Sequence, residues 1–148
     1  MNKEVSLVDV VDYNYSSLPL HLYTQNGDIP FDDNSVNTTI MYVILHHADD
    51  PEHVIREAAR VTRRRMIILE GYAETDEIRR RNSFIDWFFN RVIRDTDINV
   101  PLNYRTQSQW DAIFKKYGFH ITEMVDMGID EPVAPEHHIL YIVDRVDE

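Results

Sequence analysis

The sequence contains no cysteine and only four glycines among its 148 residues. The lack of cysteine excludes disulfide frameworks, thiolate zinc fingers, iron–sulfur clusters and thiol nucleophiles. The glycines lie far apart, at Gly27, Gly71, Gly118 and Gly128, so no glycine-rich loop that cradles a phosphate or a dinucleotide is present. No apolar run approaches the roughly 18 residues of a membrane span, and no apolar segment follows a basic start. We therefore expect a soluble, cytoplasmic protein with no membrane contact.

Basic residues are also scarce. Lys and Arg number 15 against 26 Asp and Glu, which gives a formal net charge of −11 and a sequence pI near 4.9. Neutralising nucleic-acid phosphates takes a basic face, so this composition argues against a nucleic-acid binder. What is present is a hydrophobic fraction of 43% without repeats or Gly/Ser linkers, which predicts a single domain over residues 1–148.

The first half of the chain predicts a strand, helix, strand unit. Residues 5–11 predict a first strand, and residues 25–37 form a turn-rich stretch anchored by Ile29 and Phe31. Residues 38–45 run apolar without alternation, the pattern of a strand buried on both faces. Asp50 and Pro51 are typical of a helix start, and the helix extends to about residue 62. A short apolar strand at 66–69 completes a βαβ unit and indicates an α/β protein.

The second half predicts two helices and two further strands. Residues 74–94 include a long helix with a broad apolar stripe that faces the core, formed by Ile78, Phe84, Ile85, Phe88, Val92 and Ile93. Residues 107–117 predict a shorter amphipathic helix that ends at Gly118. Residues 120–127 and 138–146 predict an antiparallel pair of strands at one edge of the sheet.

Three stretches together resemble a known family: IPFDDNS at residues 29–35, LHH at 45–47, and DP at 50–51 followed by REAARV at 56–61. They are similar to the middle of class I S-adenosylmethionine-dependent methyltransferases, in the small-molecule, type 11-like branch. The resemblance covers most of the chain from about Val5 onward. It implies a Rossmann-like, mostly parallel sheet that binds its cofactor where the strand order reverses.

The resemblance also implies a set of cofactor contacts. Asp9 stands where the family places the acid that accepts from both ribose hydroxyls, with Asp12 as the alternative. Gln25 replaces the usual Asp beside the adenine amino group, an exchange that keeps an acceptor there, and Asn26 lies next to it. Tyr42 completes the expected S-adenosylmethionine site.

The family's first strand and glycine-rich loop have no counterpart in this sequence, which begins at what should be the second strand. In the family that strand is central, so its absence leaves a gap in the sheet or forces the flanking strands to pair. We expect a partner chain or a second copy to fill the gap, unless the sheet has rearranged or the chain is a remnant.

Three further residues are candidates for the acceptor side. His46 is the candidate general base for methyl transfer, against simple packing at a strand end. Adjacent residues in a strand point to opposite faces, so His46 and His47 are not expected to hold one metal together, and no metal site is predicted. Trp87 and Tyr104 are the candidate substrate contacts, although aromatic residues at helical spacing also form cores.

Two functions remain open from the sequence. The chain is either the carboxyl-terminal part of a split or degenerate small-molecule methyltransferase, or a non-catalytic subunit that stabilises or regulates an active one.

Overall fold

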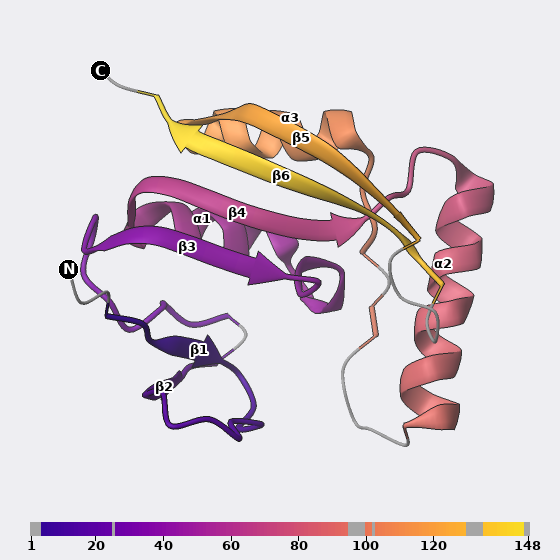
Figure 1. The fold of residues 1–148 in the computed structure, drawn as a ribbon, viewed down its shortest axis with the longest axis horizontal. Coiled ribbons are helices and arrows are strands. Elements are labelled where there is room, and N and C mark those ends of the chain that lie inside the picture. Colours follow the sequence, from indigo (N-terminus) through magenta and orange to yellow (C-terminus); the bar gives the residue numbers. More distant parts are fainter. Residues whose placement is uncertain (1–3, 25, 95–99, 102, 130–134, 147–148) are drawn as a thin grey trace.

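The computed structural model describes residues 4–24, 26–94, 100–101, 103–129 and 135–146 (Figure 1). Its strands are β1 (Leu7–Asp9), β2 (Leu20–Leu22), β3 (Val36–Tyr42), β4 (Thr62–Gly71), β5 (Phe119–Ile129) and β6 (His137–Arg145). Its helices are α1 (Pro51–Val61), α2 (Asp76–Phe88) and α3 (Gln107–Lys116), with a 3-10 turn η1 (Leu45–His47) and a π-helical continuation of α2, η2 (Phe89–Ile93). In the part of the chain described, no helix is long and apolar enough to cross a membrane.

The main sheet has the strand order β3-β4-β6-β5. β3 and β4 are parallel and are connected through α1, whereas β6 runs antiparallel to both β4 and β5. The predicted βαβ unit and the predicted antiparallel pair at the sheet edge are therefore both confirmed. The fold class, α/β with a Rossmann-like sheet, is as expected.

Local capping fixes the helices that the sequence predicts best. The Asp50 carboxylate accepts hydrogen bonds from the backbone N–H groups of Glu52 and His53, each at 3.1 Å, and Pro51 occupies the first helical turn. At α3, Thr106 and Gln109 form a reciprocal capping box. Gly118 follows α3 with a φ of 79°, a left-handed conformation that costs glycine little.

One face of the main sheet carries the core. Register partners on β3, β4 and β6, such as Met41, Ile68 and Tyr141, place their side chains on this face. Helices α1 and α3 pack on the same face. Its most deeply buried members are Leu45, Ile55, Met66, Ile68, Phe114, Phe119 and Val143. Burying a large apolar side chain contributes about 1.5–3 kcal/mol relative to leaving it exposed, so this face dominates the stability of the domain.

The opposite face is apolar but only partly covered. Ile40 of β3, Ile67 of β4 and Ile142 of β6 are register partners, and Ile40 remains 69% exposed. Tyr42, two residues further along β3, is 60% exposed. The prediction that residues 38–45 form a strand buried on both faces is therefore wrong. β3 is the outer strand of its sheet, and among the described residues no helix packs on its second face.

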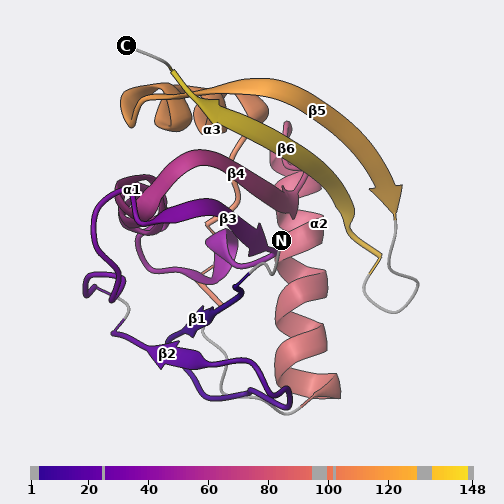
Figure 2. The same cartoon turned by 60° about the vertical axis from the view of Figure 1, so that its left-hand side comes forward.

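The β1–β2 pair forms a separate two-stranded parallel sheet. Figures 1 and 2 both show it beside β3, on the side away from β4. Among the described residues, no strand joins β1 to β3 by a hydrogen-bonded ladder. Of the arrangements expected from the resemblance, the one in which β1 and β3 pair directly is therefore not what the structure shows.

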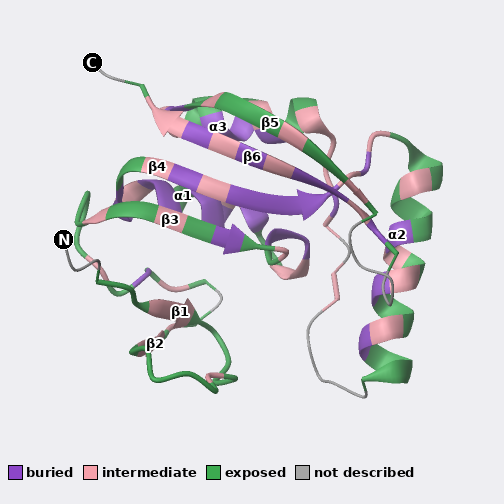
Figure 3. Ribbon diagram, viewed as in Figure 1, coloured by how far each residue is buried: buried purple, intermediate pink, exposed green. Residues whose placement is uncertain are grey.

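The long helix exists, but its orientation is the reverse of the prediction. The buried residues of α2 and η2 are Asn82, Asp86 and Asn90, spaced at i, i+4 and i+8 on one face. The predicted core stripe lies outward instead: Phe84, Phe88, Val92 and Ile93 are exposed, and Ile78 and Ile85 are only partly buried (Figure 3). Polar side chains of α2 therefore face the rest of the protein.

Candidate functional site

A polar cluster lies where β3 and β4 end. His46 and His47 come from the turn η1, Glu70 from the end of β4, and Asp86 from the inner face of α2. The turn forms because the chain leaves β3 through Val43, whose φ is 51°. A positive φ is rare for a β-branched residue, and here it bends the chain out of the strand direction. The prediction that His46 and His47 lie in a strand and face opposite ways is consequently wrong.

Glu70 holds His46 in place. Nδ1 of His46 lies 2.9 Å from Oε2 of Glu70, and Oε1 of Glu70 accepts the backbone N–H of Leu45 at 2.6 Å. The two side chains are 1% and 2% exposed. Burial lowers the pKa of His46, but the Glu70 carboxylate outweighs it and the net change is upward. Burial conversely raises the pKa of Glu70, and His46 with two backbone N–H groups brings it below its usual range.

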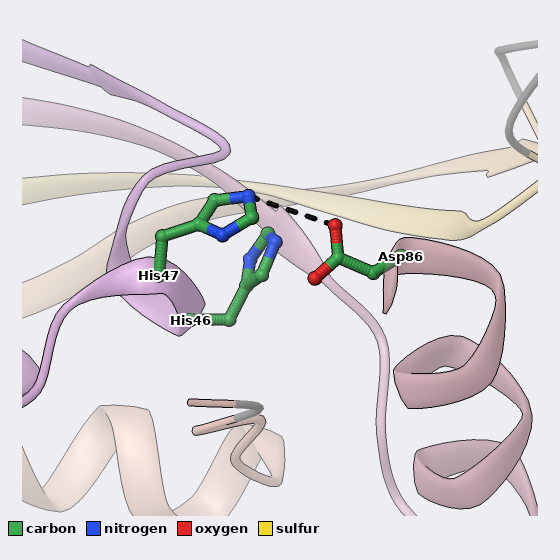
Figure 4. Close-up of side chains that lie close together, drawn as sticks. All are labelled: His46, His47 and Asp86. Carbon is green, nitrogen blue, oxygen red and sulfur yellow. Dashed lines mark ion pairs between the residues drawn. The ribbon is translucent and has the colours of Figure 1, made fainter. Parts of the chain in front are cut away.

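His47, on the turn η1, and Asp86, on α2, lie close to each other. Nε2 of His47 lies 3.6 Å from Oδ1 of Asp86, and the imidazole rings of His46 and His47 have centroids 4.2 Å apart. Figure 4 shows both imidazoles directed toward the Asp86 carboxylate. Asn90, one turn further along, donates its side-chain N–H to Oδ1 of Asp86 at 2.7 Å. The other carboxylate oxygen, Oδ2, is buried and accepts no hydrogen bond from the described residues.

Tyr104 forms the second wall of the cluster. Its ring stacks on His46, with centroids 4.7 Å apart and planes 10° apart. Its hydroxyl donates to the carboxylate of Glu136, 3.0 Å from each oxygen. Burial, together with the Glu136 charge, raises the pKa of Tyr104 far above its usual range. Burial also raises the pKa of Glu136, to about 6. The Tyr104 ring can lie here because Gly71 has no side chain, since a Cβ at that position would come within 2.7 Å of Cε1 of Tyr104.

The predicted cofactor residues that the structure describes come from β1, β3 and the turns that follow β1 and β2, and not from η1, β4 or α2. Asp9 ends β1, and its Oδ1 accepts the backbone N–H groups of Val10 and Val11 at 2.7 and 3.1 Å. Asp12 caps the next turn by accepting from Asn14, Asn26 is exposed, and Tyr42 ends β3. Gln25 lies outside the described residues.

The two predicted substrate aromatics do not share a surface. Tyr104 is buried against His46, as described above. Trp87 is 45% exposed on the outer side of α2, where its ring lies 6.2 Å from that of Phe84. A helix turns about 100° per residue, so Trp87 cannot lie on the same face as its neighbour Asp86. The structure thus brings Tyr104, but not Trp87, to His46.

Sequence reasoning missed Glu70, Asp86, Asn90 and Glu136. The signal for two of them was present: Asn82, Asp86 and Asn90 repeat every four residues, which places three polar side chains on one helical face. Glu70 directly follows the apolar run at 66–69, a position where a carboxylate is buried only with partners. Glu136 carried no comparable signal.

The sheet order, the βαβ unit and the site at the ends of β3 and β4 define an α/β domain of the Rossmann-like methyltransferase type. Residues 6–69 match the family model described as methyltransferase domain. Over these residues, which make up less than half of the chain, the resemblance to class I S-adenosylmethionine-dependent methyltransferases of the type 11 branch is confirmed. A search of curated protein sequences finds no match.

Solved structures share the fold at low sequence identity. A protein from Bacillus halodurans assigned as a methyltransferase superposes with a TM-score of 0.68 at 14% identity, covering 98% of this chain and 83% of its own. Bacillus subtilis YcgJ gives 0.65 at 14% identity, with 90% and 73% covered. A chain from the complex between the Haloferax volcanii methyltransferase activator Trm112 and a protein assigned as a methyltransferase gives 0.61 at 18% identity. In that comparison the alignment covers 91% of this chain and 65% of the other, just under two thirds.

Proposed function

We propose that this chain is the carboxyl-terminal portion of a class I methyltransferase that transfers a methyl group from S-adenosylmethionine to a small molecule. The observation that carries the proposal is the methyltransferase match over residues 6–69, which includes β1, β3 and the η1 turn. S-adenosylmethionine would supply an activated methyl group on a sulfonium, which a nucleophile on the acceptor displaces. The protein's task in such a transfer is chiefly to position the two reactants and exclude water.

The nucleoside side of the cofactor fits the residues present. Asp9 uses one carboxylate oxygen for its own turn, and a carboxylate has about four lone-pair sites, so Oδ2 can still accept from ribose hydroxyls. β1 ends at Asp9 and β3 ends at Tyr42. In Figure 1 the arrowheads of both strands point toward the side on which α2 lies. Asn26 and Gln25 follow β2 in the chain, as the resemblance requires of adenine contacts. We assign Asp9, Gln25, Asn26 and Tyr42 to the nucleoside.

On the acceptor side we assign His46 and Tyr104. The hydrogen bond from Nδ1 to Glu70 leaves Nε2 of His46 as the nitrogen that can take a proton from the acceptor. Tyr104 fixes the plane of that imidazole by stacking on it. Trp87 lies on the outer side of α2. In this proposal it would contact only a moving acceptor or a protein partner.

The methionine side of the cofactor needs residues that the described structure does not provide. We propose that a partner chain or a second copy of this chain completes the cleft at β3. Support comes from the break between β1 and β3, and from the exposed apolar face that carries Ile40 and Tyr42. One structural neighbour comes from a complex with a methyltransferase activator, so a protein partner has a precedent in this fold.

The same open face favours a second candidate function, a non-catalytic subunit that docks on an active methyltransferase. Calorimetric titration of the purified 148-residue chain with S-adenosylhomocysteine separates the two. The enzyme proposal expects binding that Asp9→Ala abolishes and Asp12→Ala preserves. Absence of binding to the wild-type chain, with the fold intact by circular dichroism, would mean that the chain is either the docking subunit or an incomplete half that binds the cofactor only with its partner.

A further inference from the structure

We infer that His46, His47 and Asp86 form a binding site for a divalent transition-metal ion. One ligand atom from each residue lies within 4.8 Å of the other two. Around a zinc ion with bonds of about 2.1 Å, tetrahedral ligand atoms are about 3.4 Å apart, so the three side chains are close to the spacing that a metal requires. His47 and Asp86 are already 3.6 Å apart. This inference stands on the cluster alone and does not depend on the proposed methyl transfer.

The surroundings of two of the three ligands, His46 and Asp86, orient them for this task. A histidine that ligates a metal through Nε2 donates its Nδ1–H to a carboxylate or carbonyl, which fixes the tautomer. Glu70 lies 2.9 Å from Nδ1 of His46 and provides that carboxylate. Asn90 holds Oδ1 of Asp86 in the same way, at 2.7 Å. Both supporting contacts are buried, so the ligands cannot rotate freely away from the site.

Asp86 provides an independent indication of a cation site. The residue is only 7% exposed, and its Oδ2 is buried without a hydrogen-bond partner among the described residues. A buried carboxylate oxygen left in this state is costly, and coordination to a metal ion would satisfy it. Figure 4 shows this carboxylate facing the two imidazoles.

The donor set selects the class of metal. Two imidazoles and one carboxylate suit Zn²⁺, Fe²⁺ or Co²⁺, whereas Mg²⁺ and Ca²⁺ prefer oxygen ligands throughout. Three protein ligands leave coordination positions open, as in catalytic rather than purely structural sites. His47 is partly exposed, so solvent or an acceptor molecule has access from its side. When the metal is bound, Nε2 of His46 is a ligand and does not act as a base.

The test is a titration of the full 148-residue chain with Zn²⁺ by calorimetry, repeated with Co²⁺ by visible absorption and with Mg²⁺. We expect one Zn²⁺ or Co²⁺ per chain, no comparable binding of Mg²⁺, and a loss of at least about tenfold in affinity for His47→Ala and for Asp86→Asn. The matched control is His137→Ala, because His137 is a partly exposed histidine that pairs with the carboxylate of Asp126 and is not one of the three ligands.

Equal binding by wild type, His47→Ala and Asp86→Asn would overturn the inference, as would a loss in His137→Ala as large as in His47→Ala. Circular dichroism of each variant separates lost ligation from lost folding. If Asp86→Asn fails to fold, the partly exposed His47 still provides the deciding variant. Neither outcome depends on S-adenosylhomocysteine binding, so the metal site and the methyltransferase proposal can fail separately.

Discussion

Nδ1 of His46 lies 2.9 Å from Oε2 of Glu70, in a pair that is almost fully excluded from solvent. The second oxygen of Glu70 accepts the backbone N–H of Leu45, so the carboxylate contacts both His46 and the turn that carries His46. The hydrogen bond determines which imidazole nitrogen is available for chemistry, because a proton on Nδ1 leaves the lone pair on Nε2. The orientation of His46 therefore depends on a residue 24 positions away in the chain.

Glu70→Gln should reverse the tautomer of His46. If the amide oxygen keeps the Leu45 N–H, the amide NH₂ then faces Nδ1 and donates to it, which places the imidazole proton on Nε2 and blocks ligation there. Loss of a supporting carboxylate generally costs about 10–100-fold in metal affinity, and we expect Zn²⁺ affinity to fall by at least that much. Calorimetry gives the affinity, and ¹⁵N chemical shifts of the histidine ring report the tautomer. Unchanged ¹⁵N shifts would contradict this account of Glu70.

Glu136 should make stability depend on pH. Its pKa is about 6 in the folded chain, against an ordinary value of 4.5, because burial outweighs the opposing effects of His46, Tyr104 and His138. A raised carboxyl pKa stabilises the fold fully below about pH 4.5, and this contribution is lost as the pH rises through about 6. The difference amounts to about 2 kcal/mol of unfolding free energy.

Glu136→Gln mimics the protonated acid and can still accept from the Tyr104 hydroxyl. We expect the variant to be more stable than wild type by about 1–2 kcal/mol at pH 7.5 and equally stable at pH 4.5, measured by urea unfolding in the presence of EDTA. A constant difference between the two proteins at every pH would mean that Glu136 does not titrate in this range.

Gly71→Ala should destabilise the chain through Tyr104. The added Cβ would lie 2.7 Å from Cε1 and 3.2 Å from Cδ1 of the Tyr104 ring, so the ring must move off His46. Overpacking of this kind typically costs about 1–3 kcal/mol. Thermal unfolding of Gly71→Ala in the wild-type and Tyr104→Ala backgrounds measures the coupling. If the cost is the same in both backgrounds, the contact with Tyr104 is not its cause.

Ile40→Lys should dissociate an assembly of the chain without unfolding it. Ile40 is 69% exposed, and a substitution at such a position changes the free energy of unfolding by only about 0.5 kcal/mol. If a second copy of the chain covers this face, a lysine there places a charge in an apolar contact and dissociates the assembly. Light scattering after gel filtration measures the mass, with Arg63→Ala as an exposed control. A wild-type chain that is monomeric across the concentration range would exclude the second copy and leave a different partner.

Local signals were sufficient where neighbouring residues decide the structure. Asp50 and Pro51 predicted the start of α1, and Gly118 predicted the end of α3, because caps act over a few residues of backbone. The βαβ unit followed from the order of apolar segments. The apolar periodicity of residues 74–94 correctly predicted a helix, but it gave the wrong buried face, because no core was available there for Phe84 and Phe88 to enter.

The candidate site was predicted only in part. His46 and Tyr104 were identified from the resemblance, and the structure brings them into stacking contact. Their partners Glu70, Asp86 and Glu136 were not identified, since each comes from a different element and no spacing in the sequence connects them. The error over His47 had a single cause, the left-handed conformation of Val43, which turns an expected strand end into a 3-10 turn.

The sequence by itself determined the class of fold, the helix boundaries and the methyltransferase resemblance, because capping, periodicity and motifs are encoded in short stretches of chain. Only the tertiary structure decided that β3 keeps an open face, that α2 turns its polar side inward, and that two histidines and an aspartate converge. Burial and convergence depend on which elements pack together, and that is a property of the whole assembled sheet rather than of any one segment.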